Sequence, residues 1–316
     1  MKMCLVIGGS GFIGKQLTRL LCDSGREVVV LGRRPEAPDG FHPSCRYISG
    51  NYSDRKLLNS LMHRGCEVID LAYSTVPKTS YEDAMYDLLS NLPTCVGLFQ
   101  EALQAGISRL LIVSSGGTVY GPAIQLPIRE DHRTLPVSPY GITKLTTDLY
   151  ASMFHRNAGL PVVIARPSNA YGEGQRVGTG QGFIAAAIDA VLSGREIEIY
   201  GVNGTTRDYI HVADVAEGLL TVLEQGEVGE VYNLGTGVGT SNSEIIRIIE
   251  MFAKIRDIPI RIKVLPSRRF DVGENVLDST KLRERSGWVP SIGIQEGIGR
   301  IWNKAVNEKL LSKYST

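Results

Sequence analysis

The stretch CLVIGGSGFIG, residues 4–14, decides the fold. Four apolar residues run directly into glycines, and leucines then recur at helical spacing, so the order predicts a strand, a glycine turn and a helix. The glycines allow a tight turn and a close approach to a pyrophosphate, and the helix N-terminus offers backbone N–H groups to phosphate. The expected cofactor-binding residues in this stretch are Gly8, Gly11, Phe12, Ile13 and Gly14.

The end of the second predicted strand, residues 27–32, bears on the choice of dinucleotide. A dinucleotide fold normally places an acidic residue there for the adenosine ribose 2′-hydroxyl. This chain has Gly32 instead, followed by Arg33 and Arg34. Loss of a carboxylate and gain of guanidinium groups suit a 2′-phosphate. The expected cofactor is therefore NAD or NADP, with a slight lean towards NADP; the alternative is that both arginines are solvated turn residues.

Three further runs predict buried strands whose ends would face the cofactor, in residues 46–54, 68–73 and 110–113. A helix is expected over about 86–105. The positions expected to contact the cofactor in these segments are Asn51, Tyr52, Leu71, Ala72, Asn91 and Ser114.

Tyr140 and Lys144 stand four residues apart in SPYGITK, residues 138–144, which places both on one helical face. A phenol is a poor base near neutral pH because its unperturbed pKa is about 10. A neighbouring ammonium, together with a cationic nicotinamide, favours the phenolate and makes Tyr140 an acid/base. The predicted strand 110–113 runs into SSGGTVYG, residues 114–121, which is a natural place for a proton-relay hydroxyl.

With these motifs in this order, the chain resembles the extended short-chain dehydrogenase/reductase family. Three later segments are similar to its nucleotide-sugar epimerase and dehydratase branch, and most of all to UDP-glucose 4-epimerases. They are RPSNAYG (166–172), GTTRDYIHVADVA (204–216) and NLGTG (233–237). The resemblance spans residues 1 to about 302.

The resemblance implies an α/β fold, with a doubly wound parallel (Rossmann) sheet and a smaller discontinuous lobe. Residues 1–167 plus about 209–237 would bind the dinucleotide, and about 168–208 plus 238–316 the nucleotide sugar. It also implies a homodimer, because in relatives the helices near 86–105 and 140–157 form a four-helix bundle. Both helices carry surplus apolar residues here, although burial within the monomer is an alternative.

The implied activity is redox-neutral 4-epimerisation of a UDP-sugar, in which Tyr140 is the acid/base. Lys144 would favour its ionised form and hold the nicotinamide ribose. Hydride leaves the sugar C4, the 4-keto sugar rotates, and hydride returns to its other face. UDP-glucose, UDP-N-acetylglucosamine and UDP-glucuronate all remain open as substrates.

The third catalytic group does not transfer from the family, because Gly116 stands where the family has serine or threonine. Ser115 precedes it and Thr118 follows it; because successive strand residues face opposite ways, only one is expected to reach the substrate, with Thr118 slightly favoured. The residues after Gly116 also offer no carboxylate of the kind that dehydratases and decarboxylases use. This favours simple epimerisation. An NADPH-dependent reductase of a 4-keto nucleotide sugar and a non-catalytic nucleotide-binding protein are the alternatives.

The family also matches this chain at six substrate-binding positions. Asn169 and Arg207 would meet the diphosphate, for which a fork of donors is suited. Tyr200 would cover the uracil. Asn275 falls where the pocket closes over the sugar C2, and asparagine permits an N-acetyl group without requiring one. The expected substrate-binding residues are Asn169, Tyr200, Arg207, Arg268, Asp271 and Asn275.

Composition excludes several other classes of function. The 316 residues are 43% hydrophobic and carry a net charge of +1, so no long-range field favours nucleic acid or an anionic membrane. The five cysteines show no CxxC or Cys/His ligand spacing and are expected to be reduced thiols. His211 is expected to be structural, and no metal site is expected. With no signal peptide or run of 18 apolar residues, the expected location is the cytoplasm.

Overall fold

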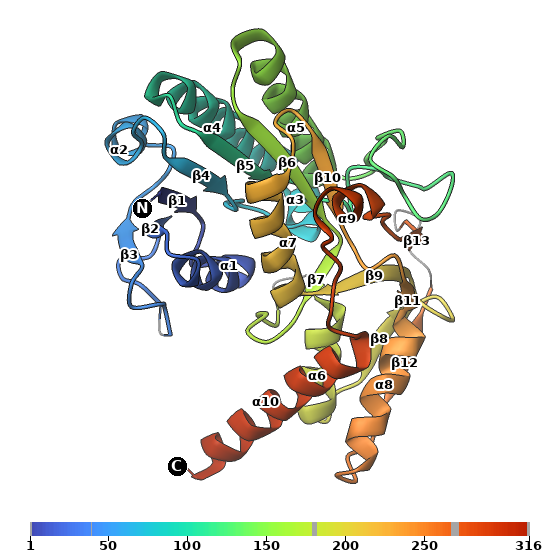
Figure 1. The fold of residues 1–316 in the computed structure, drawn as a ribbon. Coiled ribbons are helices and arrows are strands. Elements are labelled where there is room, and N and C mark those ends of the chain that lie inside the picture. Colours follow the sequence, from blue (N-terminus) through green and yellow to red (C-terminus); the bar gives the residue numbers. More distant parts are fainter. Residues whose placement is uncertain (1, 39, 179–181, 267–271, 315–316) are drawn as a thin grey trace.

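The computed structural model describes residues 2–38, 40–178, 182–266 and 272–314, and Figure 1 shows their course. Two of the residues expected to bind substrate, Arg268 and Asp271, lie outside these ranges. No helix within the described ranges is both long and apolar enough to span a bilayer.

A seven-stranded parallel sheet forms the larger part of the molecule, with the strand order β10-β6-β5-β4-β1-β2-β3. Its strands are β1 (Met3–Ile7), β2 (Glu27–Gly32), β3 (Arg46–Ser49), β4 (Glu67–Asp70), β5 (Arg109–Val113), β6 (Val162–Pro167) and β10 (Val231–Leu234). Most of them are almost wholly buried because helices cover both faces, which is why they read as continuous apolar runs.

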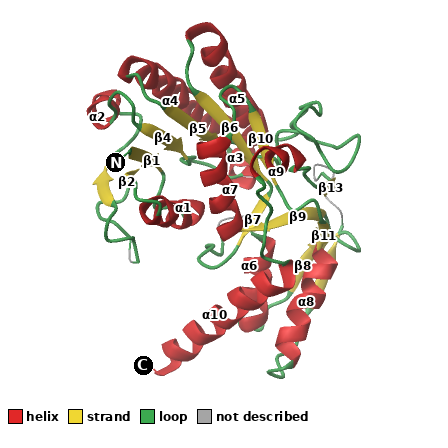
Figure 2. Ribbon diagram, viewed as in Figure 1, coloured by secondary structure: helices red, strands yellow, loops and turns green. Residues whose placement is uncertain are grey.

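Helices pack on both sides of this sheet, as Figures 1 and 2 show. One apolar cluster lies under α1 (Phe12–Asp23) and α7 (Val212–Gln225). The second lies under α2 (Arg55–Leu61), α4 (Ala84–Ala105) and α5 (Pro139–Ala158). The short helices α3 (Pro77–Glu82) and α9 (Thr280–Ser286) pack against α4 and α5, and against β10 and α7. The predicted doubly wound α/β fold is confirmed.

Smaller sheets form a second part of the structure. In one of them β9 (Thr206–His211) runs parallel to β7 (Asn169–Tyr171) and β13 (Glu274–Asn275), and antiparallel to β11 (Gly239–Ser241). In the other, β8 (Ile197–Tyr200) pairs with β12 (Ile262–Leu265). A third apolar cluster lies among the helices α6 (Phe183–Leu192), α8 (Asn242–Lys254) and α10 (Ile294–Tyr314). The predicted boundaries between two lobes stay a prediction.

The register of the large sheet brings several strand ends to one edge. Ile7 on β1 stands opposite Leu31 on β2 and Asp70 on β4, and Asp70 in turn stands opposite Ile112 on β5. Strand order reverses between β1 and β4, and ligands of open α/β sheets bind outside the carboxyl ends at such a reversal. The sequence segments expected to bind the cofactor therefore end at the same edge.

Candidate active site

The glycine turn after β1 has the geometry of a phosphate-binding turn. Gly8 has a φ of +78°, and a β-carbon there would lie 3.0 Å from the backbone nitrogen of Ala72. A β-carbon on Gly14 would lie 2.6 Å from the carbonyl oxygen of Gly8, so α1 packs directly on the turn. Gly11 is the N-cap of α1 and makes no side-chain capping hydrogen bond. This geometry leaves the start of α1 open to a phosphate group, and the expected contacts of Phe12 and Ile13 with a pyrophosphate stay a prediction.

Asp70, which belongs to none of the sequence motifs, holds the chain beside this turn. The Asp70 carboxylate is buried at the end of β4 and accepts hydrogen bonds from the Ala72 N–H (3.0 Å) and the Cys95 thiol (3.6 Å). Burial raises the pKa of Asp70 to about 6, although the Lys144 ammonium acts against the rise. The sequence feature that points to Asp70 is its place as an acidic residue at the end of a predicted buried strand.

Packing explains why β2 ends in glycine. A β-carbon on Gly32 would lie 2.6 Å from the Tyr47 hydroxyl oxygen and 3.1 Å from Ser10 Oγ. The Tyr47 hydroxyl donates a hydrogen bond to the carbonyl oxygen of Arg34 at 3.0 Å. Two hydroxyl groups thus occupy the space that a carboxylate on residue 32 would need. The missing carboxylate consequently has a cause other than a cofactor phosphate, and it no longer favours NADP by itself.

Tyr140 and Lys144 meet a second tyrosine at the edge of the sheet. The Lys144 side chain is buried, and its Nζ donates to the carbonyl oxygen of Val113, the last residue of β5, at 2.9 Å. That Nζ lies 6.0 Å from the ring centre of Tyr140 and 4.1 Å from the ring centre of Tyr73. The two rings themselves pack edge to face, 4.8 Å apart. The expected pair is therefore brought together, with its ammonium over the π face of Tyr73.

Tyr73 is the residue that pattern reasoning missed in this cluster. It is the third residue after β4, directly behind Ala72. Burial raises the pKa of its hydroxyl, so Tyr73 stays neutral and cannot compete with Tyr140 as a base. Its contribution to Lys144 is the aromatic face, which attracts a cation without adding a charge.

Buried hydrogen bonds tie α5 to α4 and to the loop after β4. Asp87 on α4 accepts hydrogen bonds from the hydroxyl groups of Thr75 and Thr143, the latter at 2.6 Å. Asn91 accepts a hydrogen bond from the Ser74 N–H at 2.9 Å and donates to the Asp87 carbonyl oxygen at 2.7 Å. The Nδ2 bond fixes the Asn91 amide on its own helix, and the Oδ1 bond holds the loop that carries Tyr73.

The other expected cofactor contacts differ in their surroundings. The Asn51 side chain accepts a hydrogen bond from the Ser53 N–H at 3.1 Å, as in an Asx turn. The Tyr52 hydroxyl lies 3.7 Å from Cys95 Sγ, and its ring packs against the second core cluster. Arg33 and Arg34 are both exposed. Their contacts with a cofactor stay a prediction.

Gly116 has no room for the hydroxyl side chain that the family carries at this position. A β-carbon there would collide with the buried side chain of Leu277, and it would lie 2.9 Å from the carbonyl oxygen of Arg166. Asn275 approaches the same residue, because its Nδ2 donates to the Gly116 carbonyl oxygen at 3.2 Å. Gly116, where the family has serine or threonine, therefore packs against Asn275 and Leu277, which lie about 160 positions later in the chain.

Thr118 and Ser115 are both half-buried, but the hydroxyl oxygen of Thr118 is itself buried. This Oγ1 has no hydrogen-bond partner among the described residues. A buried hydroxyl without a partner is uncommon in proteins, and a substrate oxygen would supply one. Ser115 is half-buried, and its carbonyl oxygen accepts a hydrogen bond from the Thr118 N–H at 3.3 Å.

A buried polar network connects three of the recognised motifs beneath this strand end. Arg166 donates from Nε and Nη2 to Asp148 Oδ2, at 3.0 and 2.9 Å, and from Nη1 to the Tyr120 hydroxyl at 3.0 Å. The Tyr120 hydroxyl in turn donates to Asn233 Oδ1 at 2.8 Å. Burial raises the pKa of Asp148, and the Arg166 guanidinium opposes that rise. These motif residues hold α5, β6 and β10 together rather than facing a ligand.

Of the described residues expected to bind substrate, two lie near Gly116 and Gly117, and the other two lie on strands of the smaller sheets. Asn169 and Asn275 lie at the end of β5: a β-carbon on Gly117 would be 3.0 Å from Asn169 Oδ1, and the Asn275 amide reaches Gly116. Asn275 is buried, and its Oδ1 lacks a hydrogen-bond partner among the described residues. Tyr200 ends β8, and Arg207 donates to the Thr206 carbonyl oxygen at 2.9 Å.

Asp208, which follows Arg207, joins the segment NLGTG to β9 of the smaller sheet. Its carboxylate accepts hydrogen bonds from the N–H groups of Thr236 (2.9 Å), Gly237 (3.3 Å) and Leu277 (3.2 Å). Burial nevertheless raises the pKa of Asp208. The same carboxylate thereby fixes the backbone of Leu277, the residue that fills the space beside Gly116.

His211 makes two contacts from a buried position. Its Nδ1 accepts a hydrogen bond from the Ala213 N–H at 3.3 Å, which caps α7. Its Nε2 lies 3.0 Å from a Glu173 carboxylate oxygen. Because Nδ1 acts as an acceptor, Nε2 is the donor to Glu173. These contacts join the start of α7 to the loop after β7.

Residues 4–235 match the model of the NAD dependent epimerase/dehydratase family. A putative UDP-glucose 4-epimerase from Methanocaldococcus jannaschii is 32% identical over 303 residues, which cover 95% of this chain and 97% of that protein. A dTDP-4-dehydro-6-deoxyglucose reductase from Escherichia coli is 27% identical, with 94% and 95% covered.

Two solved structures are similar over nearly the whole chain. The UDP-glucose 4-epimerase of Thermotoga maritima, solved with UDP-glucose, has a TM-score of 0.89 at 28% identity and covers 98% of this chain and 99% of its own. The UDP-glucose 4-epimerase of Thermus thermophilus, solved with NAD, has a TM-score of 0.84 at 30% identity and covers 95% and 97%.

Proposed function

The chain belongs to the NAD-dependent epimerase/dehydratase family, and from this premise we propose that it interconverts a UDP-sugar and its 4-epimer through a transient 4-keto intermediate. The observation that carries the proposal is the meeting of Tyr140 and Lys144 at the carboxyl edge of the sheet, beside the glycine turn. The edge is where ligands of open α/β sheets bind.

In this mechanism Tyr140 takes the proton from the C4 hydroxyl group of the sugar and later returns it. Bound NAD supplies a reversible hydride acceptor for C4. Lys144 is held by Val113 and by the ring of Tyr73, so its ammonium is kept beside Tyr140 without a neutralising carboxylate bond in the contacts described. Thr118 offers its unpaired hydroxyl to the sugar oxygen.

NAD is the cofactor that we propose. The Thermus thermophilus relative was solved with it, and the packing of Tyr47 against Gly32 accounts for the missing carboxylate without a 2′-phosphate. For the sugar, we propose a UDP-hexose, because the Thermotoga maritima relative was solved with UDP-glucose. Asn169, Tyr200, Arg207 and Asn275 are proposed as its contacts, with Arg268 and Asp271 outside the described residues.

A homodimer is part of the proposal. On α4 and α5, Leu89 is 60% exposed and Leu149 is 61% exposed. Further exposed apolar side chains on these two adjacent helices are Met85, Tyr86, Ile142 and Tyr150. Two such helix pairs would bury these side chains against each other as a four-helix bundle.

A second candidate is an NADPH-dependent reductase of a 4-keto nucleotide sugar. Two observations favour it: Gly116 has no space for the family hydroxyl, and a reductase from Escherichia coli is 27% identical to this chain. A reductase would consume one reduced cofactor for each sugar converted. An epimerase would return every hydride to the sugar.

Proton NMR of the purified protein with UDP-glucose, UDP-N-acetylglucosamine or UDP-glucuronate, each with catalytic NAD or NADP, tests the proposal. Formation of the 4-epimer with NAD supports it, and the fastest pair identifies the sugar and the cofactor. If none of the three sugars changes while a 4-keto nucleotide sugar is reduced by NADPH, the reductase replaces the epimerase. If nucleotide sugars bind and none reacts, the protein is a nucleotide-binding protein without this activity.

A further inference from the structure

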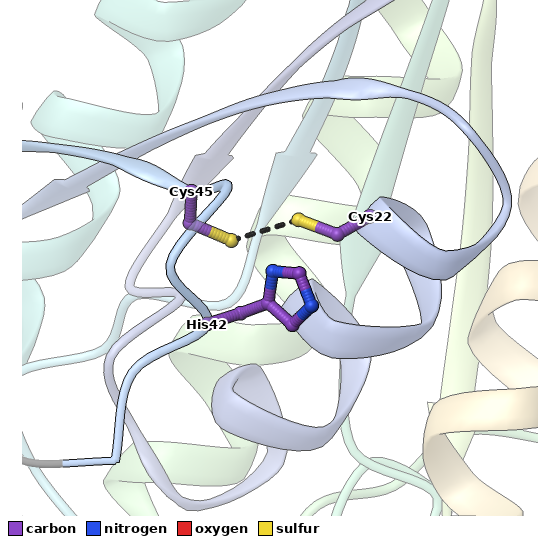
Figure 3. Close-up of side chains that lie close together, drawn as sticks. All are labelled: Cys22, His42 and Cys45. Atoms are coloured by element: carbon purple, nitrogen blue, oxygen red, sulfur yellow. Dashed lines mark hydrogen bonds between the residues drawn. The ribbon is translucent and has the colours of Figure 1, made fainter.

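Cys22, His42 and Cys45 come together away from the candidate active site, between the end of α1 and the segment that leads into β3 (Figure 3). We propose that these three side chains bind a zinc ion, which links the loop after β2 to α1. The site is distinct from the place where Tyr140 and Lys144 meet, and it does not depend on the proposed reaction.

The donor atoms are already close enough to share one ion. One donor atom from each of the three residues lies within 4.8 Å of the other two. The Sγ atoms of Cys22 and Cys45 are 3.0 Å apart, and Figure 3 shows the imidazole of His42 beside them. All three residues are half-buried, so solvent reaches each of them in part.

The types of donor favour zinc over harder cations. Two thiolates and one imidazole are typical zinc ligands, whereas magnesium and calcium prefer oxygen. With Zn–S bonds of about 2.3 Å and tetrahedral angles, two sulfurs stand about 3.8 Å apart. The two sulfurs in the structure therefore need to separate by under about 1 Å, which side-chain rotation can supply. The fourth position would be taken by water.

A carboxylate lies on the far side of the imidazole. Asp23 Oδ1 is 3.7 Å from His42 Nε2. Histidines that bind metals usually donate the second ring N–H to a carboxylate or carbonyl group, which fixes the ring. A side-chain movement of under about 1 Å would bring this carboxylate within hydrogen-bond distance of Nε2, which leaves Nδ1 of His42 for the metal. The Ser44 N–H now donates to Nδ1 at 3.2 Å, and because the bond is exposed, water can replace it when the metal binds.

The spacing of these residues explains why the sequence predicts no metal site. Cys22 lies in the last turn of α1, and His42 and Cys45 follow it 20 and 23 positions later, which matches no familiar pair of ligand motifs. The fold creates the cluster: β2 runs away from α1, and the loop that follows it returns to the end of that helix. The turn from His42 to Cys45 is closed by a hydrogen bond from the Cys45 N–H to the His42 carbonyl oxygen at 3.0 Å.

A bound zinc ion would affect the loop beside the proposed cofactor-binding edge rather than the catalytic residues. The loop between Gly32 and Cys45 carries Arg33 and Arg34 at its start. A metal at its end would close the loop against α1 and restrict its motion. Zinc should therefore raise the thermal stability of the protein while leaving the proton transfer by Tyr140 unchanged.

Cobalt(II) is the probe for the test, because it takes tetrahedral zinc sites and gives visible absorption that zinc lacks. The full chain is reduced, stripped of metal and titrated with Co²⁺ under anaerobic conditions. We expect one Co²⁺ per chain, with thiolate-to-cobalt charge-transfer bands and tetrahedral d–d bands that Zn²⁺ abolishes. Zn²⁺ should also raise the melting temperature of the metal-free protein.

Variants locate the site. Cys22→Ser and Cys45→Ser should each reduce the charge-transfer intensity and weaken Co²⁺ binding by more than about tenfold, as should His42→Ala. Asp23→Asn should weaken it by about tenfold, since it removes the group that orients the imidazole. The controls His63→Ala, an exposed histidine, and Cys66→Ser, a thiol outside the cluster, should bind as the unchanged chain does.

The wild-type titration is decisive even if a variant fails to fold. A reduced, folded protein that gives no thiolate-to-cobalt band at stoichiometric Co²⁺ would overturn the proposal. The same holds if the band persists in both cysteine variants. If only oxidation joins Cys22 to Cys45, seen as a loss of two hydrogens by mass spectrometry without any metal binding, the pair is a redox pair and the zinc site is wrong.

Discussion

Leu277 fills the space beside the α-carbon of Gly116, so the position where the family has serine or threonine has room only for glycine. The leucine is fully buried and its backbone N–H is held by Asp208. The two residues come from different parts of the chain, and neither can change size alone without affecting the other.

Gly116→Ser should therefore destabilise the protein by about 1–3 kcal/mol, because the new side chain overpacks a filled site. Leu277→Ala alone should cost about 2–5 kcal/mol through the cavity it leaves. Combined, the two changes should cost at least about 1 kcal/mol less than their sum in urea unfolding. Gly97→Ser is the control, since nothing lies within 4 Å of a β-carbon there. Strict additivity would contradict the packing account.

Thr118→Val should lower kcat by about tenfold to a hundredfold, because it removes the buried hydroxyl proposed to meet the sugar oxygen while keeping the shape of the side chain. Ser115→Ala should change kcat by less than about threefold, and it serves as the matched control. The measurement is steady-state turnover with the best sugar. The reverse order of effects would assign the proton relay to Ser115.

Tyr140→Phe should lower turnover by about a hundredfold or more and leave the affinity for the nucleotide sugar within about threefold. The hydroxyl carries the proton, whereas the ring packing against Tyr73 is retained. Calorimetric binding and turnover, measured on the same preparation, separate the two effects. Near-normal turnover would remove Tyr140 from the mechanism.

Asp70 should make stability fall as pH rises. Burial raises the pKa of Asp70 from 3.8 to about 6, so the native state keeps a proton that the unfolded state has lost between these values. The stability that protonated Asp70 contributes is fully present below about pH 3.8 and lost as pH rises through about 6. The loss is about 3 kcal/mol for a shift of about two units.

Asp70→Asn should remove this component while keeping the acceptor for the Ala72 N–H. Urea unfolding at several pH values between about 4 and 7 should show the variant gaining about 3 kcal/mol relative to the unchanged chain as pH rises. The exposed Asp131→Asn variant gives the control profile. Parallel profiles for all three proteins would show that Asp70 is not the source.

A double change of Leu89 and Leu149 to lysine should convert a dimer into a monomer, because both side chains would face the partner in the proposed four-helix bundle. Light scattering after gel filtration gives the mass. Val202→Lys is the control, since Val202 is 83% exposed outside these helices. The proposal fails if the unchanged chain is already a monomer at micromolar concentration.

Local patterns predicted the parts of the site that one segment builds alone. The glycine turn needs only the residues between β1 and α1, and the pairing of Tyr140 with Lys144 follows from helical spacing. The sequence also showed the surplus of apolar residues on α4 and α5, but it did not show which of them pack in the core and which remain exposed. Leu145 and Phe154 pack against core clusters, whereas Leu89 and Leu149 remain exposed.

What the sequence could not predict depends on segments that meet only after folding. Tyr73 reaches Lys144 because β4 and β5 are neighbours. Leu277, which forms an isolated β-bridge with Ile128, packs beside Gly116 although 161 positions separate the two residues. The hydrogen bonds that the Asn91 amide makes with Ser74 and Asp87 likewise join separate segments, and its contact with a cofactor stays a prediction. No spacing within one segment encodes such contacts.

The ratio of sugar converted to NAD supplied tests the central claim most directly. The protein is incubated with an excess of UDP-glucose, UDP-N-acetylglucosamine or UDP-glucuronate and a small, known amount of NAD, and both the 4-epimer and the reduced cofactor are measured over time. The account predicts many 4-epimer molecules formed per NAD with no accumulation of reduced cofactor, because Tyr140 and the hydride act reversibly at one carbon. Reduced cofactor formed in proportion to sugar consumed, or no 4-epimer with any of the three candidate sugars, would contradict it.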